Sequence, residues 1–166
     1  MSEIKLKPIG IIHTSFKQPK GTPIQPSRSD GAVGWIELYS EYVRGVSDLD
    51  GFSHIVLIYY FHLSKGFELI VTPYLDNNLR GLFATRAPRR PNPIGISVVK
   101  LQRIEDNILH VINVDIVDGT PLLDIKPHIP EFNSPENIRV GWLNNKNENN
   151  DIKLADNRFH KKEPNG

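Results

Sequence analysis

The sequence predicts an all-β fold, a small β-barrel with few short helices, and not a Rossmann sheet. Short segments rich in Ile, Val and aromatic residues recur along the chain, separated by Gly, Pro, Asn and Asp. Only residues 40–46 and 134–138 are suited to a helical turn, so the strand–helix alternation of a dinucleotide fold is missing. A closed barrel removes exposed sheet edges, which makes it the simplest arrangement for about seven strands.

The predicted strands, in chain order, are residues 9–13, 33–39, 54–61, 67–72, 81–85, 96–104 and 108–117. The third is almost entirely apolar, so we expect it to be central and buried. The last two are separated by a short polar run, which predicts a hairpin. Residues 17–34 form a long Pro- and Gly-rich connection, and long ordered loops in compact domains are often functional.

A chain of 166 residues predicts one domain, and its composition shifts after Trp142. Residues 144–166 hold seven Asn and nine charged residues. We therefore predict a barrel domain over residues 1–142 and a polar, mobile tail over residues 143–166.

Several classes of protein are excluded by composition. The chain has no cysteine, which rules out disulfides, zinc fingers, iron–sulfur clusters and cysteine nucleophiles and fits a cytoplasmic protein. It has neither a run of 18 apolar residues nor an apolar signal core, so we expect no membrane association. The six histidines lack metal-ligand spacing, and no bound metal is expected.

Charge is balanced overall, at +1, but uneven locally. Residues 77–104 carry six basic side chains and no acid. This excess has two interpretations, a solvated face or a patch that binds an anion such as phosphate or RNA.

Two segments are dense in residues with special chemistry. Residues 84–95 hold three prolines, which stiffen the loop that presents Arg86, Arg89 and Arg90. Such a loop is either a rigid connector or, as we favour, a binding loop. Residues 118–127 begin with an Asp-Gly turn, and in an extended chain Asp124 and Lys126 share one face. That pair could be a surface ion pair or a site for ribose hydroxyls and an anion.

These segments together resemble the TsaA-like (TrmO-type) family of S-adenosylmethionine-dependent tRNA adenosine methyltransferases. The matching stretches are PIGIIHTSF at residues 8–16, TPIQP at 22–26, LDGFSHI at 49–55 running on to Phe61-His62, FATR at 83–86, RPNPIGIS at 90–97, DGTP at 118–121 and DIKP at 124–127. The resemblance covers residues 8 to about 133. Ala87 and Arg89 depart from the residues common at their positions in the family.

The resemblance implies a homodimeric barrel that methylates the exocyclic N6 of threonylcarbamoyl-adenosine beside the anticodon of tRNA, with S-adenosylmethionine as cofactor. The implied cofactor-binding residues are His62, Arg86, Arg90, Pro91, Asn92, Ile94, Gly95, Asp118, Thr120, Asp124 and Lys126. The candidate RNA-binding residues are Arg86, Arg89 and Arg90.

The chemistry leaves the identity of the base open. The N6 proton must leave, and a group with a pKa near neutrality would help. His62 and Asp118 are the catalytic candidates, although a histidine at the end of a buried strand is often structural. Tyr59, Tyr60 and Trp35 are candidates for stacking on the flipped base. The alternatives are a non-catalytic barrel that binds S-adenosylmethionine or a nucleotide, and a protein whose arginine loop only binds RNA.

Overall fold

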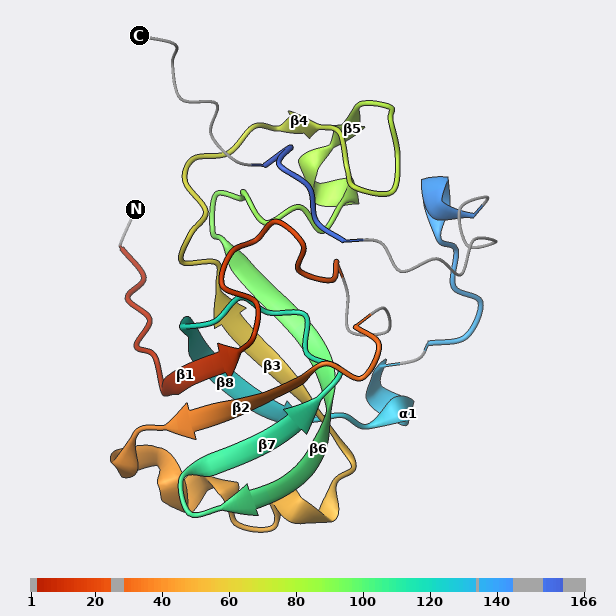
Figure 1. Ribbon diagram of the computed structural model, residues 1–166. Helices are drawn as coiled ribbons and strands as arrows, with labels where there is room; N and C mark the ends of the chain where they lie inside the picture. Colours follow the sequence, from red (N-terminus) through yellow and green to blue (C-terminus); the bar gives the residue numbers. More distant parts are fainter. Residues whose placement is uncertain (1–2, 25–28, 134, 145–153, 160–166) are drawn as a thin grey trace, which may run out of the picture.

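The computed structural model describes residues 3–24, 29–133, 135–144 and 154–159. Six strands, which are β1 (Gly10–Thr14), β2 (Val33–Leu38), β3 (His54–Tyr60), β6 (Ile94–Glu105), β7 (Ile108–Ile112) and β8 (Thr120–Pro127), form one antiparallel barrel. Their order around the closed barrel is β1-β2-β7-β6-β3-β8 (Figure 1). The predicted all-β barrel is confirmed.

The barrel closes because alternate residues of each strand point inward. On β3, Ile55, Leu57 and Tyr59 lie inside and are at most 4% exposed. Their β2 counterparts, Ile36 and Leu38, are equally buried. Burying one such side chain contributes about 1.5–3 kcal/mol, so the period-two pattern selects the register of each strand.

The two ends of the barrel are covered differently. The 3-10 helices η2 (Ser40–Val46) and η3 (Leu49–Gly51) pack Val43, Val46 and Leu49 against the core and close the lower end in Figure 1. At the other end, residues 113–119 cross between β7 and β8. We call this end the mouth.

The last barrel strands differ from the prediction. The predicted strand 108–117 ends at Ile112, because Asn113 takes a left-handed backbone conformation with φ 65° that breaks the ladder. Residues 122–126 are not among the predicted strands, although an extended chain there would put Asp124 and Lys126 on one face. They belong to β8, which begins at Thr120 and pairs with both β1 and β3.

The other predicted strands are shorter than expected, because they lie outside the barrel. Of the predicted strands 67–72 and 81–85, only β4 (Ile70–Val71) and β5 (Arg80–Gly81) pair, as a separate ribbon. The 3-10 helix η4 (Leu82–Ala84) follows β5. The predicted turn at 40–46 is the helix η2, whereas residues 135–138 are not helical. A single turn, α1 (Pro130–Asn133), occurs earlier, where Pro suits a first helical position.

An overlying segment, residues 62–93, rises from the mouth and carries β4 and β5 (Figure 1). It has its own small core of Val71, Leu82 and Ala87, against which Phe159 packs. The helix η5 (Gly141–Leu143) also touches this segment, since the Trp142 indole donates to the Ala84 carbonyl at 2.9 Å.

The described part of the tail lies against the rest of the chain. The Ala155 amide donates to the Thr22 carbonyl, and the Gly21 amide donates to the Ala155 carbonyl, each at 2.8 Å. The Arg158 guanidinium donates to the carbonyls of Pro73 and Asp76. The division into a barrel domain and a mobile tail stays a prediction, because residues 145–153 and 160–166 lie outside the described residues. Within the described ranges, no helix is long and apolar enough to cross a membrane.

Candidate functional site

Three strands end together at the rim of the mouth. Because side chains alternate along a strand, neighbouring residues at each end point to opposite sides of the barrel wall. The inward residues are Tyr59, Gly95 and Thr120, and their outward neighbours are Tyr60, Ile94 and Pro121. The rim therefore separates an interior site from a site on the outer face, and both motif loops reach it.

His62 lies just beyond β3, over the mouth. Its Nδ1 lies 3.3 Å from the Thr120 hydroxyl, which donates its only proton to the Val117 carbonyl at 2.6 Å. The hydroxyl can therefore only accept from His62, which places the imidazole proton on Nδ1. Burial lowers the pKa of His62, and the nearby Asp118 opposes this shift. A neutral His62 with an unprotonated Nε2 follows.

Asp118 is held as a carboxylate. It accepts hydrogen bonds from the Thr14 amide at 3.0 Å and from the Lys17 ammonium at 2.7 Å. The Lys17 hydrogen bond, followed by that of Thr14, lowers the pKa of Asp118. Such a carboxylate is a weak proton acceptor. Its contacts suit Asp118 to stabilising the turn and to keeping a negative charge beside His62.

A chain of polar side chains lies inside the mouth, and two of its members, Ser97 and Asp115, are not among the predicted site residues. The Tyr59 hydroxyl lies 3.0 Å from the Ser97 hydroxyl, which donates to Asp115 Oδ1 at 2.6 Å. Burial raises the pKa of Asp115 to about 6, and the Ser97 hydrogen bond, the backbone hydrogen bond of Asp115 and the charge of Arg86 oppose the shift, in that order. Asp115 stands three residues before the Asp-Gly turn, and its position in an apolar run was the only sequence signal for it.

Gly95 has a packing role. A Cβ at this position would lie 2.3 Å from Tyr59 Cε2 and 2.9 Å from Phe61 Cζ. The close approach that this glycine permits is thus that of the Tyr59 and Phe61 rings, which meet edge to face at 5.4 Å. Gly95 lets Tyr59 reach Ser97.

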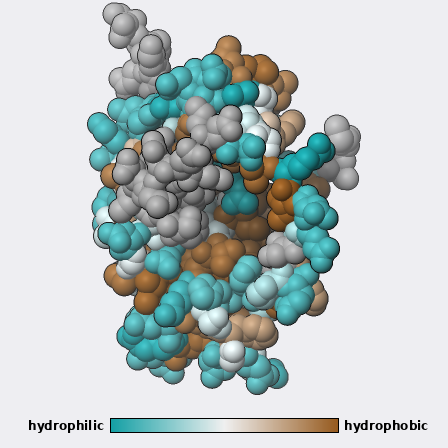
Figure 2. Space-filling view, turned by 90° about the vertical axis from the view of Figure 1, so that its right-hand side faces the viewer, coloured by the Kyte–Doolittle hydropathy of each residue, from teal (hydrophilic) through white to brown (hydrophobic). Residues whose placement is uncertain are grey.

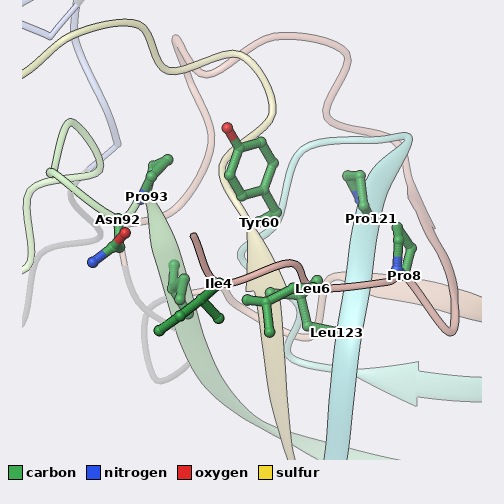
Figure 3. Close-up of a pocket in the computed structure, with 9 residues that line it drawn as sticks. Ile4, Leu6, Pro8, Tyr60, Asn92, Pro93, Pro121 and Leu123 are labelled. Atoms are coloured by element: carbon green, nitrogen blue, oxygen red, sulfur yellow. The ribbon is translucent and has the colours of Figure 1, made fainter. Parts of the chain in front are cut away.

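The outer face carries a groove of about 320 Å³ below the rim (Figure 3). The N-terminal segment crosses β6, β3 and β8 there, and Ile4 and Leu6 form part of the lining. The other lining residues are Pro8, Tyr60, Asn92, Pro93, Ile94, Pro121 and Leu123. Two predicted cofactor residues, Asn92 and Ile94, therefore share this groove.

Asp124 and Lys126 also lie on the outer face, where Lys126 Nζ is 2.8 Å from Asp124 Oδ2. The sequence prediction that they share one face is confirmed, and the bulge between β3 and β8 turns that face outward. Both side chains remain partly accessible, since Lys126 is 61% and Asp124 45% exposed. The predicted cofactor residues are thus divided between the mouth and the outer face.

The proline-rich loop uses its arginines in three ways. Arg90 donates to the carbonyls of Thr85 and Ala87, so it braces its own loop. Arg89 donates to the Lys65 carbonyl at 3.0 Å. Arg86 is exposed, and its charge acts on Asp115 inside the mouth. Of these three arginines, Arg86 is therefore the one that influences the ionisation of Asp115.

The aromatic candidates differ in access. Tyr59 is 4% exposed and committed to Ser97, whereas Tyr60 is 41% and Trp35 44% exposed. Trp35 stacks on His13 at 5.2 Å. Figure 2 shows that the side on the right of Figure 1 is hollowed at about mid-height, with hydrophobic and hydrophilic residues bordering the hollow. Among the described residues, no three His, Asp or Glu side chains form a group that could hold a metal ion.

Comparison with known proteins agrees with this arrangement. Residues 11–134 match the family model of the tRNA-methyltransferase O N-terminal domain. A probable S-adenosyl-L-methionine-binding protein of Pyrococcus abyssi is 56% identical over 137 residues, which cover 82% of this chain and 74% of that protein. The tRNA (adenine(37)-N6)-methyltransferase of Homo sapiens is 32% identical over 139 residues, 80% of this chain and 32% of that protein.

The barrel also resembles a solved structure. The crystal structure of TrmO from Pseudomonas aeruginosa superposes with a TM-score of 0.72 and 35% identity, covering 84% of this chain and 62% of that one. This chain therefore spans less than two thirds of the solved TrmO chain and about a third of the human enzyme.

Proposed function

The chain belongs to the family of the tRNA-methyltransferase O N-terminal domain, and we propose that it is an S-adenosylmethionine-dependent tRNA (adenine-N6)-methyltransferase. One observation carries the proposal: the family match spans both motif loops, and in the fold these loops meet at one rim. The names of the similar archaeal and mammalian proteins, which are binding proteins for this cofactor and tRNA methyltransferases, support it.

The residues of the outer groove suit the cofactor. Its apolar walls, which include Ile94 and Leu123, fit an adenine ring, and the exposed Asn92 amide offers a donor and an acceptor. The carboxylate of Asp124 suits ribose hydroxyls, and Lys126 suits a carboxylate. When bound, S-adenosylmethionine supplies an electrophilic methyl group on a sulfonium. The protein has only to hold it at the rim, where placement can supply about 7–11 kcal/mol.

We place the substrate adenosine at the mouth, on the other side of the rim. The base must leave the anticodon-loop stack to reach the mouth. The finer assignment, N6 of threonylcarbamoyl-adenosine beside the anticodon, is supported by Arg86, whose positive charge suits the threonyl carboxylate. A cytoplasmic location belongs to the same proposal.

Nucleoside mass spectrometry tests this function. The protein is incubated with S-adenosylmethionine and two tRNA preparations, one carrying threonylcarbamoyl-adenosine and one lacking it. We expect a mass increase of one methyl group on the modified nucleoside only. Binding of S-adenosylmethionine in calorimetry without any methyl transfer would favour the non-catalytic barrel instead.

Calorimetry with variants tests the groove. Asn92→Ala and Asp124→Ala are expected to weaken S-adenosylmethionine binding without unfolding the protein. Val33→Ala, on the exposed face of β2, serves as the control. If affinity stays within about twofold in both groove variants, the groove does not hold the cofactor.

We also propose a homodimer formed through the outer face. Tyr60 and Ile94, which line the groove, and Ile96 leave 41%, 39% and 51% of their surface exposed on this face. A twofold interface needs only one such self-complementary patch, and it would enclose the groove. Light scattering at micromolar concentration is expected to show twice the chain mass. A particle of 18.8 kDa with full activity would contradict the proposal.

A further inference from the structure

The polar chain in the mouth is unusual for a barrel core. Tyr59 is 4% and Ser97 2% exposed, and both point inward among hydrocarbon side chains. A buried polar group costs stability unless it is hydrogen-bonded, and a carboxylate costs more. Within the described residues, Ser97 alone donates a side-chain hydrogen bond to Asp115. The backbone amide of Asp115 bonds the same carboxylate, which burial desolvates.

We propose that Asp115 is the proton acceptor for methyl transfer: its carboxylate, held by Ser97 in the mouth, removes the N6 proton of the substrate adenosine. This inference rests on the proposed function. Its geometry is that of a base held by a second group, because the Ser97 hydroxyl bonds Oδ1 and Tyr59 in turn lies 3.0 Å from Ser97.

The chemistry requires such a base. A nitrogen between a purine ring and a carbamoyl carbonyl has a delocalised lone pair and is a poor nucleophile. In the step, the N6–H bond breaks and the proton goes to Asp115. The electron pair left on N6 forms the bond to the methyl carbon, and the C–S bond breaks with its pair on sulfur. A positioned base of this kind contributes about 10²–10⁴-fold in rate.

The neighbouring titratable groups fit the role less well. Asp118, on the same connection, is tied to Lys17 and Thr14, which lower its pKa. His62, just beyond β3, has a pKa lowered by burial, and its Nδ1 is engaged with the Thr120 hydroxyl. Arg86 from the overlying segment favours the anionic form of Asp115, whose pKa of about 6 leaves it ionised at neutral pH.

The test is single-turnover methylation of tRNA that carries threonylcarbamoyl-adenosine, measured from pH 5 to 8.5. We expect an acid limb near pH 6 in the wild type. Asp115→Asn should lower the plateau rate at least about 100-fold while S-adenosylmethionine affinity stays within about twofold. Ser97→Ala removes a hydrogen bond to the anion and should move the limb upward by about one pH unit. His62→Gln should leave the limb in place.

Asp106→Asn is the matched control, because Asp106 lies in the β6–β7 turn at the opposite end of the barrel. Circular dichroism checks the folding of each variant, and Ser97→Ala keeps the test decisive if Asp115→Asn does not fold. An active wild type whose Asp115→Asn variant keeps its rate within threefold, or whose limb does not respond to Ser97→Ala, overturns the assignment of Asp115. A wild type that binds S-adenosylmethionine but methylates no tRNA overturns the proposed function, and the assignment with it.

Discussion

At the closed end of the barrel, Ile36 and Leu109 face each other in register and are fully buried hydrocarbon. At the mouth, inward positions hold Tyr59 and Ser97, whose hydroxyls lie 3.0 Å apart, and Ser97 donates to Asp115. The closed end lowers the free energy of the fold through burial alone. The mouth keeps hydroxyls and a carboxylate where hydrocarbon would be more stable, and this cost supports the proposal that the site lies at this end.

The largest change in the free energy of unfolding is expected at the closed end. Leu109→Ala should lower the free energy of unfolding by about 3 kcal/mol, because the cavity adds to the lost burial. Urea denaturation measures this, with Val33→Ala on the exposed face as the control, expected to change stability by less than about 0.5 kcal/mol. The folded variant should keep its affinity for S-adenosylmethionine. A loss below about 1 kcal/mol for Leu109→Ala would mean that this end relaxes to fill the space.

At the mouth, replacing Asp115 should make the folded protein more stable. The pKa of Asp115 is about 6 in the fold against 3.8 as its ordinary value, so the fold disfavours the charged form. The resulting loss of folding stability is complete above pH 6 and disappears as the pH falls toward 4. Asp115→Asn should therefore raise the free energy of unfolding by about 2 kcal/mol at pH 7.5, and by nothing near pH 4. Urea denaturation at both pH values decides it, and a variant less stable at every pH would contradict the comparison.

The overlying segment sharpens the comparison, since its core is separate from that of the barrel. Phe159 packs against Val71, Leu82 and Ala87 and meets Tyr74 edge to face at 5.0 Å. Phe159→Ala should lower stability by about 1 kcal/mol and speed hydrogen exchange in the overlying segment, but not in the barrel strands. The control is Phe132→Ala, at a side chain that is 79% exposed. Equal acceleration in both regions would show that they unfold as one unit.

The smallest effect is expected for Arg89, on the proline-rich loop above the mouth. If its guanidinium reaches a tRNA phosphate, Arg89→Ala should weaken tRNA binding modestly and reduce the salt slope by about one unit. Affinity at three salt concentrations measures this, and S-adenosylmethionine binding should not change. Arg103→Ala is the control, because Arg103 pairs with Glu105 at the closed end. An unchanged slope would mean that Arg89 touches no phosphate, and residues 17–34 or the tail would become the better candidates for holding RNA.

The sequence by itself determined the barrel and the loops of the site. The period-two pattern of residues 54–61 and the hairpin around Asp106 specified central strands, because burial depends on local alternation. The prolines of residues 88–93 and the Asp-Gly turn at 118 specified stiff loops, because their backbone preferences are local. The shared face of Asp124 and Lys126 was predictable for the same reason.

Only the tertiary structure decided which of these residues work together. Barrel closure brings Ser97 of β6 beside Asp115, 18 positions later in the chain. It also sorts the predicted cofactor residues onto two sides of one rim, with Thr120 inside and Asn92 outside. The raised pKa of Asp115 results from neighbours distant in sequence. Desolvation is a property of the assembled core, which is why Asp115 looked ordinary in the sequence and stands out in the fold.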